Sequence, residues 1–304
     1  MKKLFIASLL IFTITSFSQN HINIAKFSYA NTPLNKFESG KEKTKIEQFD
    51  LRLNFPIVLN EKHVLLTGLF GNKTSVKFDS EILEHTNLFA TGLNIGLHSK
   101  YNEKWEATYM AIPKLASDFN GVSHKDFQFG YLALFNYVKR QSLKFKFGVY
   151  GNSEKYGSLI VPIFGLYYLS PNEKFEMNLN LPLLADLNYK LSNTSALGMN
   201  FDGLSSSYNL TRTIYLPDGE YAVITSNELF AYYQLKIWNS IYAKAKFGYS
   251  FFRTSEIFSE EDNIDFAVAA FNIGDNRIPL NENFNDGPIF KFELIYRIDT
   301  NKKK

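Results

Sequence analysis

The chain reads Phe49-Asp50-Leu51-Arg52-Leu53-Asn54-Phe55-Pro56-Ile57, so that every second side chain from Phe49 to Ile57 is apolar and those at 50, 52 and 54 are polar. This period-two alternation is typical of a β-strand whose two faces meet different surroundings. The same alternation recurs at 143–149, 175–181, 243–249 and 290–297. The sequence therefore predicts an all-β protein with one apolar and one polar face on each strand.

Strand length separates the two architectures that produce this pattern. A soluble β-sandwich buries the apolar face in its core, whereas a transmembrane barrel turns that face to lipid. Soluble strands usually have about five or six residues. Segments 46–59, 127–139 and 221–237 keep strand character over the roughly ten residues that a tilted membrane strand needs. Short polar turns also alternate with longer polar loops, which favours a transmembrane antiparallel up-and-down β-barrel.

The alternation and the turns together predict fourteen strands in one barrel domain, residues 19–304. They are placed at 22–30, 44–59, 62–78, 86–100, 104–116, 125–139, 142–153, 158–169, 174–182, 183–191, 195–204, 221–237, 240–254 and 288–299. If Pro182 instead lies within a strand and a neighbouring strand is also lost, twelve strands remain. Residues 264–272 are a candidate extracellular strand extension, because Phe266, Val268 and Ala270 alternate there.

The first eighteen residues have the form of a secretory signal peptide. Lys2 and Lys3 precede an apolar stretch at 4–15, and Ser16 and Ser18 are small residues at the positions that signal peptidase recognises. We expect cleavage after Ser18. An exported barrel of this kind belongs in the outer membrane, with both termini in the periplasm.

Composition excludes several other classes of function. The chain has no Cys, so disulfides, thiolate metal sites and a Cys nucleophile are impossible. A net charge of +3 is too small to suggest nucleic-acid binding. Aromatic residues flank the predicted short turns, as expected for a ring of side chains at a membrane interface; they are Tyr101, Trp105, Tyr137, Tyr189, Trp238 and Tyr242.

Four short segments resemble a known class of proteins. They are Phe17-Ser18-Gln19, the turn entry Leu187-x-Tyr189-x-Leu191-Ser192-Asn193, Phe201-Asp202-Gly203 and the closing Phe290-x-Phe292-x-Leu294-x-Tyr296. Together they resemble uncharacterised outer-membrane β-barrel proteins of Gram-negative, Bacteroidota-type bacteria. The resemblance implies location and fold and no catalytic residues. Here Arg297 to Lys304 follow Tyr296, so the segment that the barrel-insertion machinery recognises would lie slightly inside the terminus.

The predicted inward face carries the strongest functional signal. Strand parity places fifteen charged residues in the lumen, nine basic and six acidic: Asp50, Arg52, Glu106, Lys144, Lys146, Glu176, Asp186, Lys190, Glu228, Lys236, Lys244, Lys246, Lys291, Glu293 and Arg297. Such rings set ion preference in an open pore, here weakly toward anions. Equally, opposite charges on neighbouring strands pair and brace the wall. Inward Leu132, Leu134, Leu184 and Tyr150 would narrow the bore.

The remaining motifs point weakly to chemistry. His21, His63, His85, His98 and His124 show no metal-ligand spacing, and no Gly-x-Ser-x-Gly motif occurs. We therefore predict no cofactor and no metal, and an enzyme, as a membrane-embedded lipid hydrolase, is the least favoured of three hypotheses. The acidic stretch within 254–287, with Glu256, Glu260, Glu261, Asp262 and Asp265, would hold a divalent ion, fold inward as a constriction or simply be solvated.

Three functions stay open at this point. The first is a pore or transporter for small solutes or ions, and the second is a plugged structural or adhesive barrel. The third is the hydrolase. The expected partners are outer-membrane lipid, the insertion machinery and small solutes, and no nucleic acid is expected.

Overall fold

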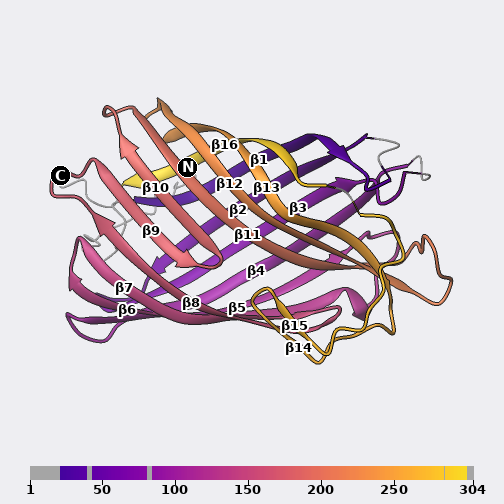
Figure 1. Ribbon diagram of the computed structural model, residues 1–304. Coiled ribbons are helices and arrows are strands. Elements are labelled where there is room, and N and C mark those ends of the chain that lie inside the picture. Colours follow the sequence, from indigo (N-terminus) through magenta and orange to yellow (C-terminus); the bar gives the residue numbers. More distant parts are fainter. Residues whose placement is uncertain (1–20, 40–42, 81–83, 284, 300–304) are drawn as a thin grey trace, which may run out of the picture.

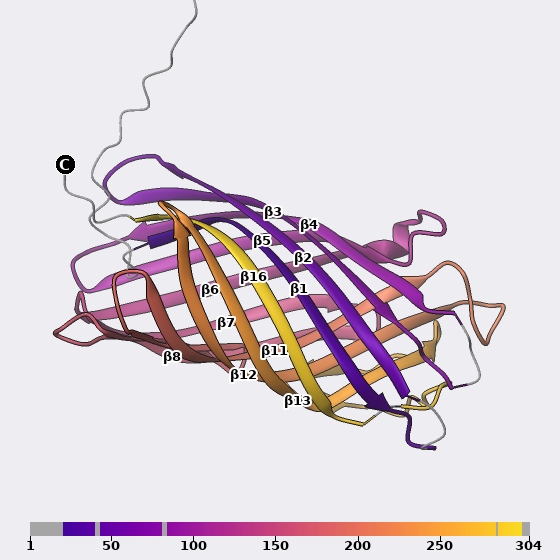
Figure 2. The ribbon, with the colours of Figure 1, turned by 90° about the horizontal axis from the view of Figure 1, so that it is seen from above.

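The computed structural model describes residues 21–39, 43–80, 84–283 and 285–299, which form one closed β-barrel (Figures 1 and 2). Fourteen strands form the wall: β1 (His21–Lys36), β2 (Lys43–Val58), β3 (His63–Val76), β4 (Thr86–Lys100), β5 (Trp105–Ser117), β6 (Phe127–Arg140), β7 (Leu143–Glu154), β8 (Gly157–Leu169), β9 (Phe175–Leu181), β10 (Leu184–Lys190), β11 (Ser195–Leu210), β12 (Glu220–Trp238), β13 (Ile241–Ser259) and β16 (Gly287–Asp299). A 3₁₀ turn, η1 (His124–Asp126), precedes β6, and a small hairpin, β14 (Phe266–Val268) with β15 (Phe271–Ile273), lies between β13 and β16.

Antiparallel pairing closes the wall into a ring. Each wall strand pairs with the next, and Ile22 of β1 lies opposite Ile298 of β16 at the seam. The predicted fourteen-strand barrel is confirmed, including the reversal at Pro182, which separates β9 from β10. In the part of the chain that the structure describes, no helix is both long enough and apolar enough to span a membrane.

The apolar face of the strands forms the outside of the barrel. Leu51, Phe55, Leu235 and Phe292 are each more than 40% exposed, although they are large hydrophobic side chains. Soluble monomers rarely expose a continuous apolar surface of this extent. A surface that surrounds a closed barrel, where every strand is paired, is suited to contact with hydrocarbon.

The two ends of the barrel differ in how the strands are connected. At the short-turn end, where β1 begins and β16 ends, the connections are 59–62, 101–104, 141–142, 170–174, 191–194 and 239–240. Asn60 closes the first of them, since its side-chain oxygen accepts the backbone N–H groups of Lys62 and His63. The opposite, long-loop end carries the longer connections, including 211–219 and 260–286.

Several strands extend beyond their predicted ends at the long-loop end. β1 continues to Lys36, β11 to Leu210 and β13 to Ser259, where the sequence predicts ends at 30, 204 and 254. Conversely, β9 and β10 have only seven residues each, while β12 and β13 have nineteen. The predicted extension at 264–272 is the β14–β15 hairpin, which pairs with β8 in parallel at Ala267 and Val268.

Candidate functional site in the barrel lumen

Two adjoining cavities occupy the lumen toward the short-turn end, and together they are called the vestibule below. Their volumes are about 440 and about 400 Å³, and both are lined by His21 and Asn178. The first is lined by amides and hydroxyls from β2 to β6, among them Asn54, Asn94 and Asn136, and by apolar side chains such as Leu66 and Met110. Volumes of this order accommodate a small organic molecule.

The second cavity is basic. Of the fifteen residues that the sequence places in the lumen, six line it: Glu176, Asp186, Lys190, Lys236, Lys244 and Arg297. Four cationic residues thus face two carboxylates. Glu106 and Lys146 line the first cavity instead.

Tyrosine hydroxyls hold both carboxylates of the basic cavity. Tyr232 donates to Asp186 Oδ1 at 2.6 Å, and Lys244 Nζ lies 3.9 Å from the other oxygen of that carboxylate. Tyr167 donates to Glu176 Oε1 at 3.1 Å. Because a Cβ at Gly198 would collide with the ring of Tyr232, a glycine is required at this position for the ring to reach Asp186. Both carboxylates therefore already accept hydrogen bonds from tyrosines of the barrel wall.

A layer of buried ion pairs lies next to the vestibule. Lys144 Nζ is 2.9 Å from Glu106 Oε2, and Glu293 Oε1 is 2.8 Å from Lys246 Nζ and 3.0 Å from Lys26 Nζ. Lys291 lies 3.7 Å from Asp202 and 3.9 Å from Glu228. Buried charges of this kind need partners, because desolvation of a lone ion is costly. These charges brace the wall in opposite-sign pairs.

The last two lumen candidates lie on β2. Asp50 accepts a hydrogen bond from Ser28 at 3.4 Å. Arg52 is exposed and stands directly opposite Lys26 in the β1–β2 ladder, so both share the inward face. Sequence reasoning missed Lys26 and Asp202, although Lys26 alternates with Ala25 and Phe27 just as the identified residues do with their neighbours.

One expected member of the interface ring faces inward instead. Tyr242 lines the basic cavity, and the guanidinium of Arg297 lies 4.7 Å from its ring centroid. Tyr242 lies two residues before Lys244 on β13, so both side chains point to the same face of the strand, which is the lumen face. Tyr101, Trp105, Tyr189 and Trp238 are exposed on the outside, and the ring of Trp105 packs on that of Tyr137 at 5.2 Å. The prediction was thus wrong for Tyr242, because proximity to a turn does not determine the side of the strand.

An apolar plug fills the lumen toward the long-loop end. One cluster packs β2 to β5 against β11 to β13, and it includes Ile46, Leu88 and Ile224. A second cluster packs β8 and the loop after β13 against the other face of β12, and it includes Val161 and Tyr221. The first residues of β12 are consequently buried on both faces, because residues 221 and 223 belong to the second cluster and residues 222 and 224 to the first. Tyr150, expected to narrow the bore, packs against the second cluster.

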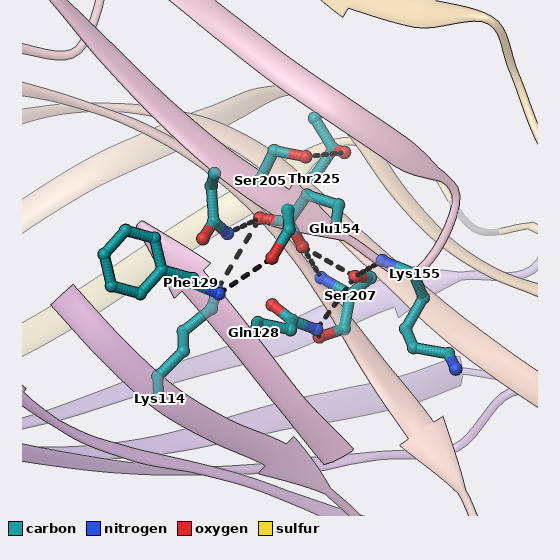
Figure 3. Close-up of polar contacts among 10 residues, drawn as sticks. Lys114, Gln128, Phe129, Glu154, Lys155, Ser205, Ser207 and Thr225 are labelled. Carbon is teal, nitrogen blue, oxygen red and sulfur yellow. Dashed lines mark hydrogen bonds and ion pairs between the residues drawn. The ribbon is translucent and has the colours of Figure 1, made fainter. Parts of the chain in front are cut away.

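A polar clamp ties β11 to the strands that it crosses (Figure 3). Beyond Asp202, β11 has no partner on β10, and the carboxylate of Glu154 accepts the backbone N–H of Ser207 at 2.8 Å and its hydroxyl at 2.6 Å. Gln128 Nε2 donates to the Ser207 carbonyl at 3.0 Å, and Lys114 Nζ lies 3.6 Å from Glu154. Side chains of β6 and β7 thus supply the hydrogen bonds that a neighbouring strand would otherwise give to the backbone of β11 at Ser207, and Lys114 of β5 pairs with the Glu154 carboxylate.

A second carboxylate holds the loop that follows β11. Asp118 accepts the backbone N–H groups of Thr211 and Arg212 at 3.0 and 2.9 Å, and Asn120 donates to it at 2.9 Å. Burial alone would raise the pKa of Asp118, but these hydrogen bonds outweigh it and lower the pKa below its ordinary value. The charged form of Asp118 therefore fastens the loop over the plug.

The acidic stretch within 254–287 is dispersed. Glu260 pairs with Lys125 at 2.7 Å, while Ile264 and Ala267 from the same loop enter the apolar plug. In the described residues, no group of three or more His, Cys, Asp or Glu is placed to hold a metal ion. Part of this loop therefore packs onto the barrel.

His21 and His98 both line the first cavity, and two histidines bond hydroxyl groups. His63 Nδ1 is 3.0 Å from Ser99 Oγ, and His98 Nδ1 is 3.0 Å from Thr108 Oγ1. Among the described hydrogen bonds and ion pairs, none joins His63 to a carboxylate that would orient it. A serine hydrolase needs that orienting group as well as the base.

Comparisons with known proteins give one family and several distant folds. No curated protein matches the chain. The chain is similar to the COG4313 outer membrane channel from Pseudomonas putida F1, with 9% identity, 91% of this chain and 96% of that chain covered, and a TM-score of 0.44. It is also similar to the TodX monoaromatic hydrocarbon channel deltaS2 mutant, with 9% identity, 90% of this chain and 89% of that chain covered, and a TM-score of 0.38. For OccK1 (OpdK) from Pseudomonas aeruginosa, the identity is 9%, the coverage is 90% of this chain and 98% of that chain, and the TM-score is 0.33. A family model matches residues 14–274, and the chain therefore belongs to the family described as Domain of unknown function (DUF6268).

Proposed function

We propose that the chain is an outer-membrane channel for small solutes, with a path that is closed at the long-loop end in this conformation. The observation that carries the proposal is the vestibule, a polar cavity enclosed by a complete barrel whose outside is apolar. A wall of this kind separates a hydrophilic interior from lipid. The plug and the Glu154 clamp supply the closure.

The proposal includes the location of the chain. Residues 1–18, which lie outside the described part, would act as an export signal, and the short-turn end with both termini would face the periplasm. The mature chain would be inserted into outer-membrane lipid by the insertion machinery. Its sequence resemblance to Bacteroidota-type barrels supports a Gram-negative source.

The route through the barrel would favour anions. Four cationic residues against two tyrosine-bound carboxylates give the basic cavity a positive potential, and charges in a confined pore set ion preference. The buried ion pairs contribute little to this preference, because each positive charge lies next to a negative one.

Planar-bilayer conductance tests the proposal. We expect rare, brief openings of the wild-type protein, and a several-fold higher open probability for Glu154→Ala, since this substitution removes the carboxylate that holds β11 across the lumen. Reversal potentials in a salt gradient should show anion preference. Glu47→Gln is the matched control, because Glu47 forms a partly exposed pair with Lys45 at 3.4 Å. Silence of all three proteins in every salt would contradict the channel.

A plugged structural or adhesive barrel is the second candidate. The apolar packing that spans the lumen favours it, because such a plug is a stable core rather than a loose loop. This alternative predicts no conductance from Glu154→Ala and tight binding of a surface partner by the long-loop end.

A further inference from the structure

The vestibule has two chemically different sides. Lys190, Lys236, Lys244 and Arg297 lie on one side, on β10, β12, β13 and β16. The opposite side carries amides and hydroxyls from β2 to β6 together with apolar side chains, and its two charged residues, Glu106 and Lys146, already bond Lys144 and Asn178. Arg297 connects the two sides, because its Nε donates to Asn23 Oδ1 at 2.9 Å and Asn23 lines the first cavity. A single ligand therefore meets cations at one end and uncharged polar groups at the other.

The basic side has cations in excess of the carboxylates near them. Asp186 and Glu176 already accept hydrogen bonds from Tyr232 and Tyr167. In the described part of the chain, Lys190 and Lys236 form no ion pair. Lys236 Nζ lies 5.8 Å from the ring centroid of Tyr242. A carboxylate in this cavity would gain charge-assisted hydrogen bonds without displacing a carboxylate partner of either lysine.

The opposite side has an acceptor that is not used. Asn136 is 8% exposed, lines the first cavity, and its Oδ1 has no hydrogen-bond partner among the described residues. A buried acceptor without a partner is unfavourable, and a donor that reaches it recovers that free energy. A ligand hydroxyl is such a donor, whereas a second carboxylate is not.

We propose that the vestibule binds a small polyhydroxylated organic anion of the sugar-acid class. Its carboxylate lies against the basic side, and its hydroxyls lie against the amides, with one of them donating to Asn136. The size of the two adjoining cavities fits one such molecule. The inference rests on the proposed function, since it names the class of solute that the channel would take.

Isothermal titration calorimetry of the folded protein in detergent tests the site without requiring transport. The probes are D-glucuronate, D-glucose, which has the hydroxyls without the carboxylate, and acetate, which has the carboxylate without the hydroxyls. We expect glucuronate to bind at least about tenfold more tightly than either comparator, because only glucuronate engages both sides. Equal affinities for glucuronate and acetate, or no binding of glucuronate, would overturn the proposal.

Two variants assign the two sides. The double substitution Lys190→Gln with Lys236→Gln should weaken glucuronate binding at least about tenfold, and Asn136→Ala should weaken glucuronate but leave acetate unchanged. Lys45→Gln, at the long-loop end, is the control for the loss of a single lysine charge far from the vestibule. Heat-modifiable gel mobility verifies that each barrel is folded. Unchanged glucuronate affinity in the folded double variant would also overturn the site. Conductance without glucuronate binding would reject the proposed ligand and keep the channel function. Glucuronate binding without conductance would keep the ligand site and reject the channel function.

Discussion

Leu88 and Asn94 both lie on β4 and both point into the barrel, yet they meet opposite surroundings. Leu88 is fully buried in the apolar plug, while Asn94 lines the vestibule. β12 repeats the contrast, with Ile224 in the plug and Lys236 in the basic cavity. An inward position is therefore polar where the lumen holds water and apolar where another strand crosses it. The crossing of β11 and β12 divides the molecule into these two halves.

The largest difference in stability between the two halves is expected for substitutions at these two β4 positions. We expect Leu88→Ala to lower the free energy of unfolding by about 2–5 kcal/mol, because it leaves a cavity in a packed core. Asn94→Ala, in the hydrated half, should change it by less than about 0.5 kcal/mol. Urea unfolding in detergent, followed by gel mobility, measures both. Equal losses would mean that the two halves are packed alike.

Removal of the clamp should have the next largest effect. Glu154→Ala leaves the Ser207 N–H and the Lys114 ammonium without their carboxylate, and we expect a loss of about 1–3 kcal/mol. Hydrogen exchange should become faster at 205–210, with exchange in β3 and β4 unchanged. Glu47→Gln, in its partly exposed pair, should cost less than about 0.5 kcal/mol. Unaltered exchange at 205–210 would show that the plug alone holds β11.

The inward-facing residues of the vestibule half could be predicted from the sequence, and those of the plug half could not. Alternation places Lys236 and Lys244 on the inward face, since only one face of these strands is apolar. At 221–224, Tyr-Ala-Val-Ile is apolar on both faces, so period two carries no information about orientation there. The end of β11 was predicted too early for a related reason: Ser205, Ser206 and Ser207 resemble a loop, although they pair with residues 223–225 of β12 and Ser207 also bonds the distant side chain of Glu154. Pairing between Glu154 and Ser207, 53 residues apart, leaves no local pattern.

The smallest effect concerns pH at the long-loop end. Hydrogen bonds from Arg277, with a contribution from Asn272, lower the pKa of Asp275 from 3.8 to about 2. Because the folded pKa is depressed, charged Asp275 stabilises the loop fully above its ordinary pKa, and this contribution is lost as pH falls toward about 2. Hydrogen exchange at 274–280, corrected for its intrinsic pH dependence, should therefore accelerate between about pH 5 and about pH 2. In Asp275→Asn this acceleration should disappear. If it persists there, another group fastens the loop.

The seven-residue strands β9 and β10 have a consequence for the surrounding lipid. At about 3.4 Å per residue and a tilt of about 40°, each climbs only about 18 Å, whereas membrane barrels present an apolar band about 25 Å tall. Acyl chains on this flank must therefore also contact neighbouring segments, and the β14–β15 hairpin on the edge of β8 exposes Phe266, Phe271 and Ile273. Two residue pairs, a backbone hydrogen bond from Ala269 to Ile160 and the burial of Ala267 in the second apolar cluster join that hairpin to the barrel. Its exposed side chains therefore add apolar surface where β9 and β10 are short, and extraction into a thin micelle should loosen this flank before any other.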